Sequence, residues 1–331
     1  MTDFIIIFIF GLLFGFILQY ARLNRYEVIS GQAGFQDNTV LKTILLTIGV
    51  GSILLMLAIQ AGWASFHIKP FVALGVIAGG IIFGIGMAIL GYCPGTLAIS
   101  AGEGAIDAIT GILGGLISGW VFSVFFDEIQ SFLGPDLGKI SLYSIMKNHW
   151  VWYAILVFIL GLMIIYISFK IKNNKLDTGH QWIISGILLA VLNTIVFLHF
   201  TTNRPIGAST AYPYFTDKLV GNTGIYFQKI SRPGSWEVIF LSGAFIAGLI
   251  GALIKKDFQI KTCGIGQGIN KKNRLIQSFI GGFILIFGAR MAGGCTSGHI
   301  ISGGMQLAFS SLVFAVFVFI GLRLANKIFS K

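Results

Sequence analysis

Nine apolar stretches, each about as long as one bilayer crossing, run through the chain and leave few folds open to it. They fall at roughly 4–20, 41–61, 71–91, 105–126, 150–170, 182–199, 236–254, 275–291 and 306–326. Hydrophobic residues make up 55% of the 331 positions, more than a soluble domain of this size could bury. Because backbone polar groups must be paired inside lipid, stretches of this length predict helices. The sequence therefore predicts an all-α polytopic membrane protein with about nine transmembrane helices.

A short motif occurs twice in the chain, about 200 residues apart, and indicates two related halves. Phe-Gly-x-x-Met-Ala begins at Phe83 and again at Phe287, and it leads to Cys93 in the first copy and Cys295 in the second. Each cysteine is followed by a serine seven residues later and by a glycine nine residues later. The repeat predicts equivalent breaks at the ends of two apolar helices.

The expected spans divide into the same two halves. We expect a first repeat over residues 1–149, with four spans and a break at Cys93, and a second over 182–331, with four spans and a break at Cys295. The single span of the linker, 150–181, turns the second repeat over relative to the first. This is the inverted-topology arrangement common among transporters, whose site lies where the repeats meet near the bilayer midplane.

The segments that follow the two cysteines are apolar but, at about 8–10 residues, too short to cross a bilayer. Because their backbone must be satisfied within the membrane, we expect short re-entrant helices that are buried in protein. Cys93 would approach from the cytoplasmic side and Cys295 from the outside, which predicts an hourglass-like fold.

Basic residues in the loops predict the orientation, because cytoplasmic loops are richer in lysine and arginine. With nine spans the termini lie on opposite sides, and fifteen basic residues then fall on one side against seven on the other. The richer side carries Arg22, Arg25, Lys42, Lys170, Lys172, Lys175, Lys255, Lys256, Lys261, Lys271, Lys272, Arg274, Arg323, Lys327 and Lys331. The poorer side carries Lys69, Lys139, Lys147, Arg204, Lys218, Lys229 and Arg232. The sequence therefore predicts an outside N-terminus and a cytoplasmic C-terminus.

The residues after each cysteine are typical of a helix start, which is a natural anion site. Proline suits the first turn and serine or threonine the cap, as in Pro94-Gly95-Thr96 and Thr296-Ser297-Gly298. The free N–H groups and positive dipole ends of both helices would point toward the midplane. Neutral thiols at Cys93 and Cys295 would add a polarisable sulfur, suited to a large sulfur-bearing anion. The alternative is that both cysteines only pack as small hydrophobic side chains.

Arg290 lies within an apolar span, five residues before Cys295. A charge at that depth is costly and usually functional, although an arginine near the end of a span could also snorkel to the outer interface. Glu103 and His299 are expected to be polar members of the two breaks.

Ser209 and Thr210 belong to the polar segment 200–235, which either remains an external loop or dips into an entrance. Cys263 is expected to be an exposed thiol without a role. Three cysteines without close spacing form no zinc motif, so we expect neither a metal nor a cofactor.

These motifs resemble the signatures of the YeeE/YedE family over nearly the whole chain. The similar stretches are Gly-Tyr-Cys-Pro-Gly-Thr at 91–96 with Gly-Glu-Gly at 102–104, the segment 288–299, and Gly-Ala-Ser-Thr-Ala-Tyr at 207–212. The resemblance implies a bacterial inner-membrane transporter, not an enzyme, that takes up thiosulfate for sulfur assimilation and passes it between cysteine thiols. It also implies a small cytoplasmic sulfur carrier of the TusA type as a partner.

The chain departs from the family just after the first span. Some members carry a further cysteine there, in an Arg-x-Arg-Phe-Cys context, whereas residues 19–25 here read Gln-Tyr-Ala-Arg-Leu-Asn-Arg. Two other functions stay open: a membrane sulfurtransferase with a persulfide on Cys93, and a transporter of another small solute or a selenium species. The expected substrate path comprises Cys93, Cys295, Arg290, Gly95, Thr96, Thr296, Ser297, Gly298, His299, Glu103, Ser209 and Thr210.

Overall fold

The computed structural model describes residues 2–34, 36–172, 179–263 and 270–329. Within these residues the regular structure is helical and the only β-structure is a few isolated bridges, which confirms the all-α class. Two of the basic residues counted for the orientation, Lys175 and Lys331, lie outside the described ranges.

Long helices form over each of the apolar stretches that the sequence marks. They are α1 (Thr2–Tyr20), α3 (Thr39–Gln60), α4 (Ala73–Leu90), α6 (Ile106–Val124), α9 (Trp150–Lys170), α10 (Gln181–Phe197), α12 (Ile225–Ile254), α13 (Lys271–Met291) and α15 (Phe309–Phe329). In the described part of the chain, eight helical segments are long and apolar enough to cross a bilayer, and the 17-residue α10 is shorter than these. The chain is therefore built as a multi-pass membrane protein.

Shorter helices fill the connections. They are α2 (Tyr26–Ala33), α5 (Pro94–Gly102), α7 (Phe126–Leu133), α8 (Leu142–Ile145), α11 (Ala211–Val220), the π-helix η2 (Thr296–Ile301) and α14 (Ser302–Met305). Of these, α5 follows the first break, and η2 with α14 follows the second. Both segments are buried in protein, as expected for short helices whose backbone polar groups must be paired within the membrane.

Helix α12 begins earlier than the apolar pattern predicts. It starts at Ile225 rather than at 236, about three turns sooner, and it contains Pro233. The added turns are rich in polar residues, and hydropathy detects contact with lipid rather than helix itself. The sequence boundary was therefore wrong for the helix, because this helix continues beyond its apolar part.

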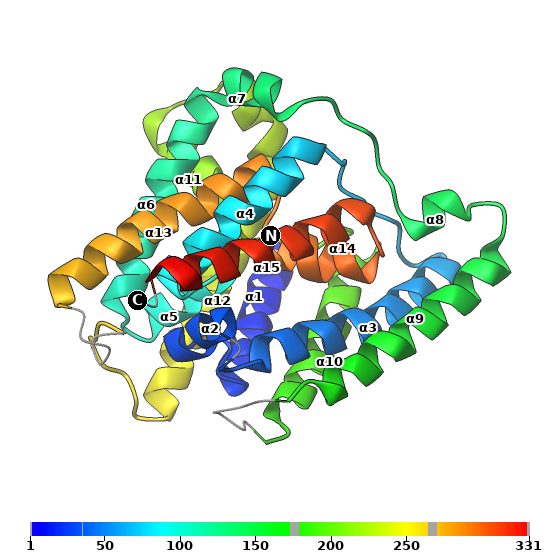
Figure 1. Cartoon of the computed structure of the whole chain (residues 1–331), viewed down its shortest axis with the longest axis horizontal. Coiled ribbons are helices and arrows are strands. Elements are labelled where there is room, and N and C mark those ends of the chain that lie inside the picture. The colour runs from blue at the N-terminus through cyan, green and yellow to red at the C-terminus, as the bar shows by residue number, and fades with distance from the viewer. Residues whose placement is uncertain (1, 35, 173–178, 264–269, 330–331) are drawn as a thin grey trace.

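Helices α4 and α13 pack against each other at the centre of the molecule (Figure 1). Gly79 of α4 lies against the backbone of Gly288, and Gly86 lies against the backbone of Leu285, so close that a Cβ at either position would collide. As residue numbers rise along α4 they fall along α13, so the two helices run antiparallel.

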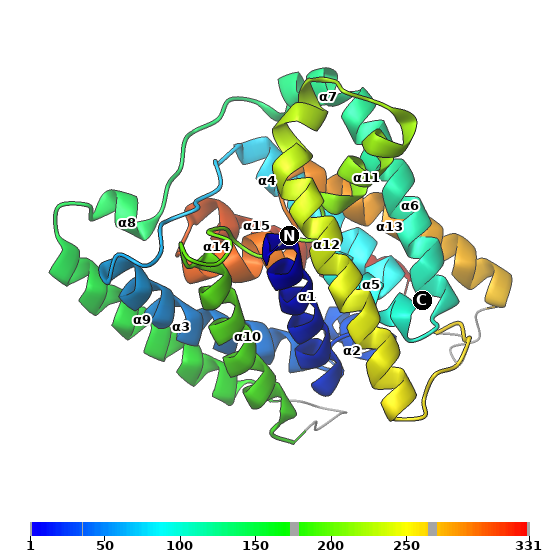
Figure 2. The ribbon, with the colours of Figure 1, turned by 180° about the vertical axis from the view of Figure 1, so that it is seen from behind.

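The other contacts between long helices fall into pairs. Helix α15 packs on α4 as α6 packs on α13, and α10 packs on α3 as α1 packs on α12. Helix α12 also contacts α5, while α3 contacts η2 and α14. Figure 2 shows α1, α12 and α10 on the face opposite to that of Figure 1. Helix α9 has no counterpart in this scheme and packs on the outer side of α3.

Candidate functional site

Each break is produced by a left-handed glycine two residues before the cysteine. Gly91 ends α4 with φ 77°, and Gly293 follows α13 with φ 76°. Glycine adopts this backbone conformation without the steric cost that a side chain would bring. The chain therefore turns out of each long helix at the equivalent position, and the cysteine becomes the residue that caps the next helix.

Cys93 caps the regular helix α5, which begins with Pro94. The Thr96 hydroxyl accepts a hydrogen bond from the Cys93 backbone N–H at 2.9 Å, and it lies 3.3 Å from the Cys93 sulfur. The thiol is only partly buried. Because Gly95 has no side chain, the ring of Phe14 packs closely against the first turn of α5.

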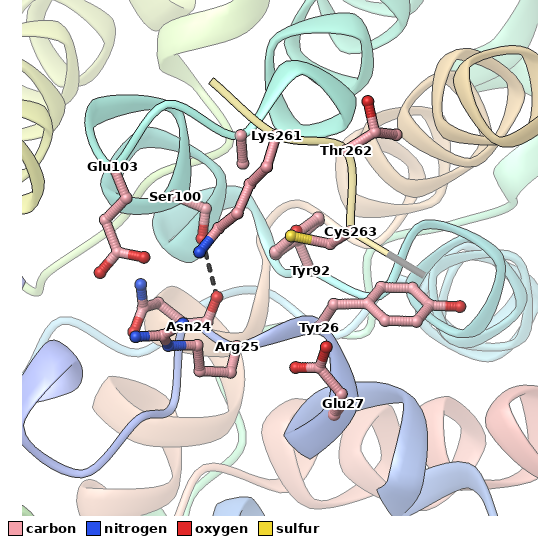
Figure 3. Close-up of a pocket in the computed structure, with 11 residues that line it drawn as sticks. Asn24, Arg25, Tyr26, Glu27, Tyr92, Ser100, Glu103, Lys261, Thr262 and Cys263 are labelled. Carbon is pink, nitrogen blue, oxygen red and sulfur yellow. Dashed lines mark hydrogen bonds between the residues drawn. The ribbon is translucent and has the colours of Figure 1, made fainter. Parts of the chain in front are cut away.

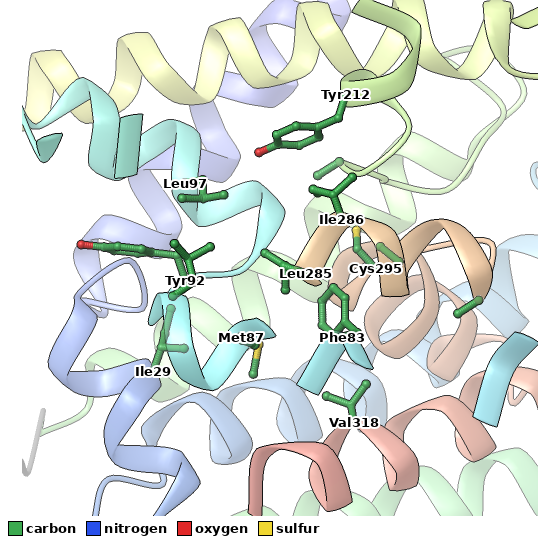
Figure 4. Close-up of a cluster of buried hydrophobic side chains, with 14 of the residues drawn as sticks. Ile29, Phe83, Met87, Tyr92, Leu97, Tyr212, Leu285, Ile286, Cys295 and Val318 are labelled. Carbon is green, nitrogen blue, oxygen red and sulfur yellow. The ribbon is translucent and has the colours of Figure 1, made fainter. Parts of the chain in front are cut away.

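Cys295 caps η2 and is almost wholly buried, at 1% exposure. Its sulfur lies 3.3 Å from the Ser297 hydroxyl. Figure 4 places it beside Ile286, in the hydrophobic cluster between α4 and α13. Thr296 follows it, with a buried hydroxyl that has no hydrogen-bond partner among the described residues.

The two breaks meet at one cavity of about 390 Å³. Cys93 and Thr96 line it from the first break, and Thr296 and Ser297 line it from the second. Most of the remaining lining is apolar. The structure thus brings together four of the residues that the sequence singled out, although they lie about 200 positions apart.

Arg290 is buried near the second break, at 8% exposure. Its Nε donates to the Tyr226 hydroxyl at 2.9 Å, and its Nη1 donates to Ser209 at 3.1 Å and to Thr210 at 2.9 Å. All three partners are neutral hydroxyls. Arg290 is therefore fixed within the protein rather than snorkelling, and its charge has no carboxylate partner among the described residues.

Lys69 is a second cation at this break, and sequence reasoning had counted it only as a loop residue. Its Nζ donates to the carbonyl of Gly293 at 2.5 Å, and it lies so close to Gly294 and Gly298 that a Cβ at either would press on it. Desolvation, followed by repulsion from Arg290, lowers the pKa of Lys69 to about 8. Like Arg290, it forms no ion pair with a described carboxylate.

The segment 205–212 dips into the protein, which decides between the two possibilities that the sequence left open. The Glu237 carboxylate accepts from the backbone N–H groups of Thr210 at 2.6 Å and Ala211 at 3.2 Å, and it pairs with Arg204 at 3.3 Å. Tyr212 points its hydroxyl toward α5 and donates to the Pro94 carbonyl at 3.3 Å (Figure 4). The segment therefore links Arg290 to the start of α5.

The two other polar candidates take different places. His299 is held by the Ala292 carbonyl at 2.7 Å from Nε2 and by the Ser311 hydroxyl at 3.1 Å from Nδ1, so it serves the packing of the second break. Glu103 lies beyond the far end of α5 and accepts from Gln19 at 2.6 Å. It lines a separate cavity and not the one between the breaks.

Sequence reasoning missed Lys69 and Tyr226 at this site. Nothing in the local sequence separates Lys69 from the other basic residues between spans, and Tyr226 falls in the turns of α12 that the apolar pattern did not include. Cys263 was also misjudged, because it is partly buried and lines the cavity at Glu103 rather than lying exposed.

Comparison with known proteins agrees with these features. The sulphur transport family matches residues 21–324. The thiosulfate transporter TsuA of Spirochaeta thermophila is 26% identical over 332 residues, which cover 94% of each chain. The thiosulfate transporter TsuA of Escherichia coli K12 is 24% identical over 344 residues, covering 96% of this chain and 92% of its own. Because the family match takes in most of the chain, the protein belongs to the sulphur transport family, the YeeE/YedE family that its motifs resemble.

Proposed function

We propose that the protein carries thiosulfate, or a related sulfur-bearing anion, into the cytoplasm across a bacterial plasma membrane. One observation carries this proposal: Lys69 and Arg290 stand together at the second break, and neither forms an ion pair with a described carboxylate. Unpaired charges inside a membrane protein are costly and mark ion pathways. A transported anion would supply the missing negative charge.

The path we propose runs from this pair of cations to Cys295, and then across the shared cavity to Cys93. The hydroxyls of Thr96, Thr296 and Ser297 line the cavity with Cys93 and offer donors that carry no formal charge. Neutral donors bind an anion less tightly than fixed cations do. The anion can therefore be captured at the charged end and still leave the neutral one.

Thiosulfate is the first substrate to test, because both named relatives are thiosulfate transporters. A sulfurtransferase would need an activated thiolate at Cys93. The side-chain partner that the structure gives its sulfur is the neutral hydroxyl of Thr96, which is no base. The geometry at Cys93 therefore supports transport over persulfide chemistry. A small cytoplasmic sulfur carrier of the TusA type stays a prediction.

We also propose that the fold is an inverted-topology repeat of about nine transmembrane helices, with α5 and η2 as re-entrant elements of an hourglass. What supports this is the paired contact scheme with α4 antiparallel to α13. A two-fold axis that exchanges antiparallel helices lies across them, and hence in the membrane plane. The basic loops favour an outside N-terminus and a cytoplasmic C-terminus.

Uptake of radiolabelled thiosulfate into liposomes that contain the purified protein tests the transport proposal. We expect label to enter the lumen, with excess unlabelled thiosulfate abolishing entry and equal sulfate leaving most of it. Uptake no greater than in protein-free liposomes would overturn the proposal. Label bound covalently to the protein, without luminal label, would favour the sulfurtransferase.

Reporter fusions test the topology. A reporter after Lys331 should be active in the cytoplasm, and one inserted in the segment 127–149 should be active outside. Two reporters on the same side would contradict both the number of spans and the inverted repeat.

A further inference from the structure

A second cavity, of about 240 Å³, lies at the far end of α5, away from the two breaks. Three segments enclose it: the α1–α2 connection at 24–27, the stretch from Tyr92 to Ala105, and residues 261–263 after α12 (Figure 3). None of its lining residues lines the cavity between the breaks. It is therefore a separate space that the proposed path has not yet used.

A buried polar side chain without a hydrogen-bond partner lines this cavity. Asn24 is 1% exposed, and neither its amide nitrogen nor its amide oxygen has a hydrogen-bond partner among the described residues. The Thr262 hydroxyl also has no partner among the described residues, but it points away from the other labelled side chains (Figure 3). Buried polar groups are seldom left unpaired in folded proteins, and those that are call for a ligand or an ordered water. The unpaired amide of Asn24, buried at the wall of this cavity, therefore indicates a binding site.

Cys263 belongs to the same cavity, and its backbone is anchored in the protein. Its N–H donates to Asp107 at 3.1 Å, and its carbonyl accepts from Arg274 at 3.0 Å. Asp107 and Arg274 form an ion pair at 2.9 Å, and both are fully buried. Arg274 also donates to the carbonyls at the end of α4, at Ile89 and Leu90. One anchor thus fixes both the Cys263 loop and the start of the first break.

The charges around the cavity suit a weakly held anion. Glu103 accepts a hydrogen bond from Gln19, and Arg25 lies 4.0 Å from Asp257 at the surface. Lys261 forms no ion pair with a described carboxylate, and its side chain extends among the other side chains that line the cavity (Figure 3). Burial, and then the Asp107 charge, raise the pKa of the Cys263 thiol, so that it stays a neutral S–H donor at pH 7.

The cavity also lies next to the proposed path. Leu23 and Ile29 line the space between the breaks, whereas Asn24 and Tyr26 line this second one. The rings of Tyr26 and Tyr92, which both line this second cavity, stand 6.3 Å apart, and Tyr92 directly precedes Cys93. An anion that leaves Cys93 toward the basic side of the protein would meet this cavity next.

We propose that this cavity is an inner binding station for the transported sulfur anion, with Cys263 as a third thiol contact beside Asn24 and Lys261. The proposal rests on the proposed function and extends it to the release side. The groups that contact the anion are an amide, a thiol and a single ammonium. The two carboxylates nearby, Glu27 and Glu103, limit the affinity and favour release.

Protection of Cys263 from modification tests the station directly. In purified full-length protein with Cys93→Ala and Cys295→Ala, a maleimide should label Cys263, and thiosulfate at the concentration that saturates wild-type uptake should slow labelling about fivefold or more. Sulfate at the same concentration should not. A labelling rate unchanged by thiosulfate would overturn the station.

Two variants make the result specific. Asn24→Leu keeps the volume of the side chain and removes the amide, so it should abolish the protection while labelling continues. In protein with all three cysteines changed to alanine, Lys255→Cys places an exposed thiol on the same loop, and its labelling should ignore thiosulfate. Protection that persists in Asn24→Leu, or that extends to Lys255→Cys, would overturn direct binding at the cavity.

Uptake by the wild-type protein separates this inference from the proposed function. If wild-type liposomes take up no thiosulfate, the proposed function fails. If they do and Cys263 is unprotected, the station alone fails. Cys263→Ala should then lower uptake by up to about tenfold, the loss expected for one modest hydrogen bond, and uptake at the wild-type rate would also overturn the station.

Discussion

The two breaks share a backbone geometry but differ in the side chains that surround the cysteine. Both begin with a left-handed glycine two residues before a cysteine that caps a buried helix. The first continues as the regular helix α5, and its thiol has a threonine hydroxyl as neighbour. The second continues as the π-helix η2, with Lys69 bound to the Gly293 carbonyl and Arg290 on the helix that leads to it.

The difference suggests a division of labour between two ends of one path. In the proposed function, fixed cations at the second break would raise the local concentration of the anion and bind it strongly. The first break offers only neutral donors and a helix N-terminus, from which an anion can depart. A repeated motif thus predicts an equivalent backbone, but the residues brought to it by other segments decide what each copy does.

Replacing Arg290 should have the largest effect, because it removes the buried charge on which the contrast depends. Arg290→Ala loses three hydrogen bonds from a charged group, and we expect thiosulfate uptake to fall by about a hundredfold. Arg290→Lys keeps the charge but cannot reach the same hydroxyls together, so it should retain partial uptake.

Uptake into liposomes at matched protein content measures this effect. Arg232→Ala, which removes an exposed arginine, is the control and should transport as the wild type does. Normal uptake by a well-folded Arg290→Ala protein would show that the charge at the second break is dispensable and would remove the contrast between the breaks.

Changes at the cysteines should have the next largest effect. Cys93→Ala removes the thiol from the neutral break, and the loss of one modest contact would slow passage about tenfold, enough to prevent growth on thiosulfate as the sole sulfur source. Cys93→Ser replaces the soft sulfur with a better hydrogen-bond donor. It should fail as the alanine does if contact to sulfur matters, and it should transport normally if the helix N-terminus alone binds the anion.

Cys295→Ala should impair growth equally or less, because Lys69 and Arg290 remain at that break. Growth is compared at matched expression of each variant. Wild-type growth by the Cys93→Ala strain would contradict transfer of the anion between thiols and would indicate that both cysteines only pack in the protein.

The sequence was sufficient for the features that depend on local patterns. Apolar length placed the long helices, and the repeated motif located both breaks together with Arg290. The sequence pattern missed the early start of α12, because a hydropathy pattern does not detect polar helical turns that extend beyond a membrane span. Turn formers in 205–212 could not show that this segment packs inward, since the decisive contact is with Glu237, far along the chain.

The rest of the site depends on contacts between distant segments. Lys69 meets Gly293, and Cys263 meets Asp107, at separations for which spacing in the sequence carries no information. The unpaired amide of Asn24 is visible only once its surroundings are known. Local chemistry could therefore be predicted at the two cysteines, whereas the charged cluster and the second cavity required the fold.

The pH dependence of uptake should show the smallest effect, and it tests whether Lys69 acts as a charge. Since the pKa of Lys69 is lowered to about 8, its charged form prevails at pH 7 and its neutral form at pH 9. Binding of an anion needs the charged form, so uptake should fall a few-fold as the external pH rises from 7 to 9. The groups that act on Lys69 are Arg290, Cys295, Glu237 and Arg204. Of these, both arginines stay charged throughout this range.

Lys69→Arg separates Lys69 from the other groups, because arginine stays charged across the range. Uptake by this variant should be nearly constant between pH 7 and 9, with the internal pH of the liposomes held fixed so that only outward-facing groups titrate. Lys69→Met, which keeps the length but not the charge, should be low and equally flat. If uptake by Lys69→Arg falls with pH as it does for the wild type, the titrating group is elsewhere. Anion binding at the second break would then depend on the charge of Arg290 and not on that of Lys69.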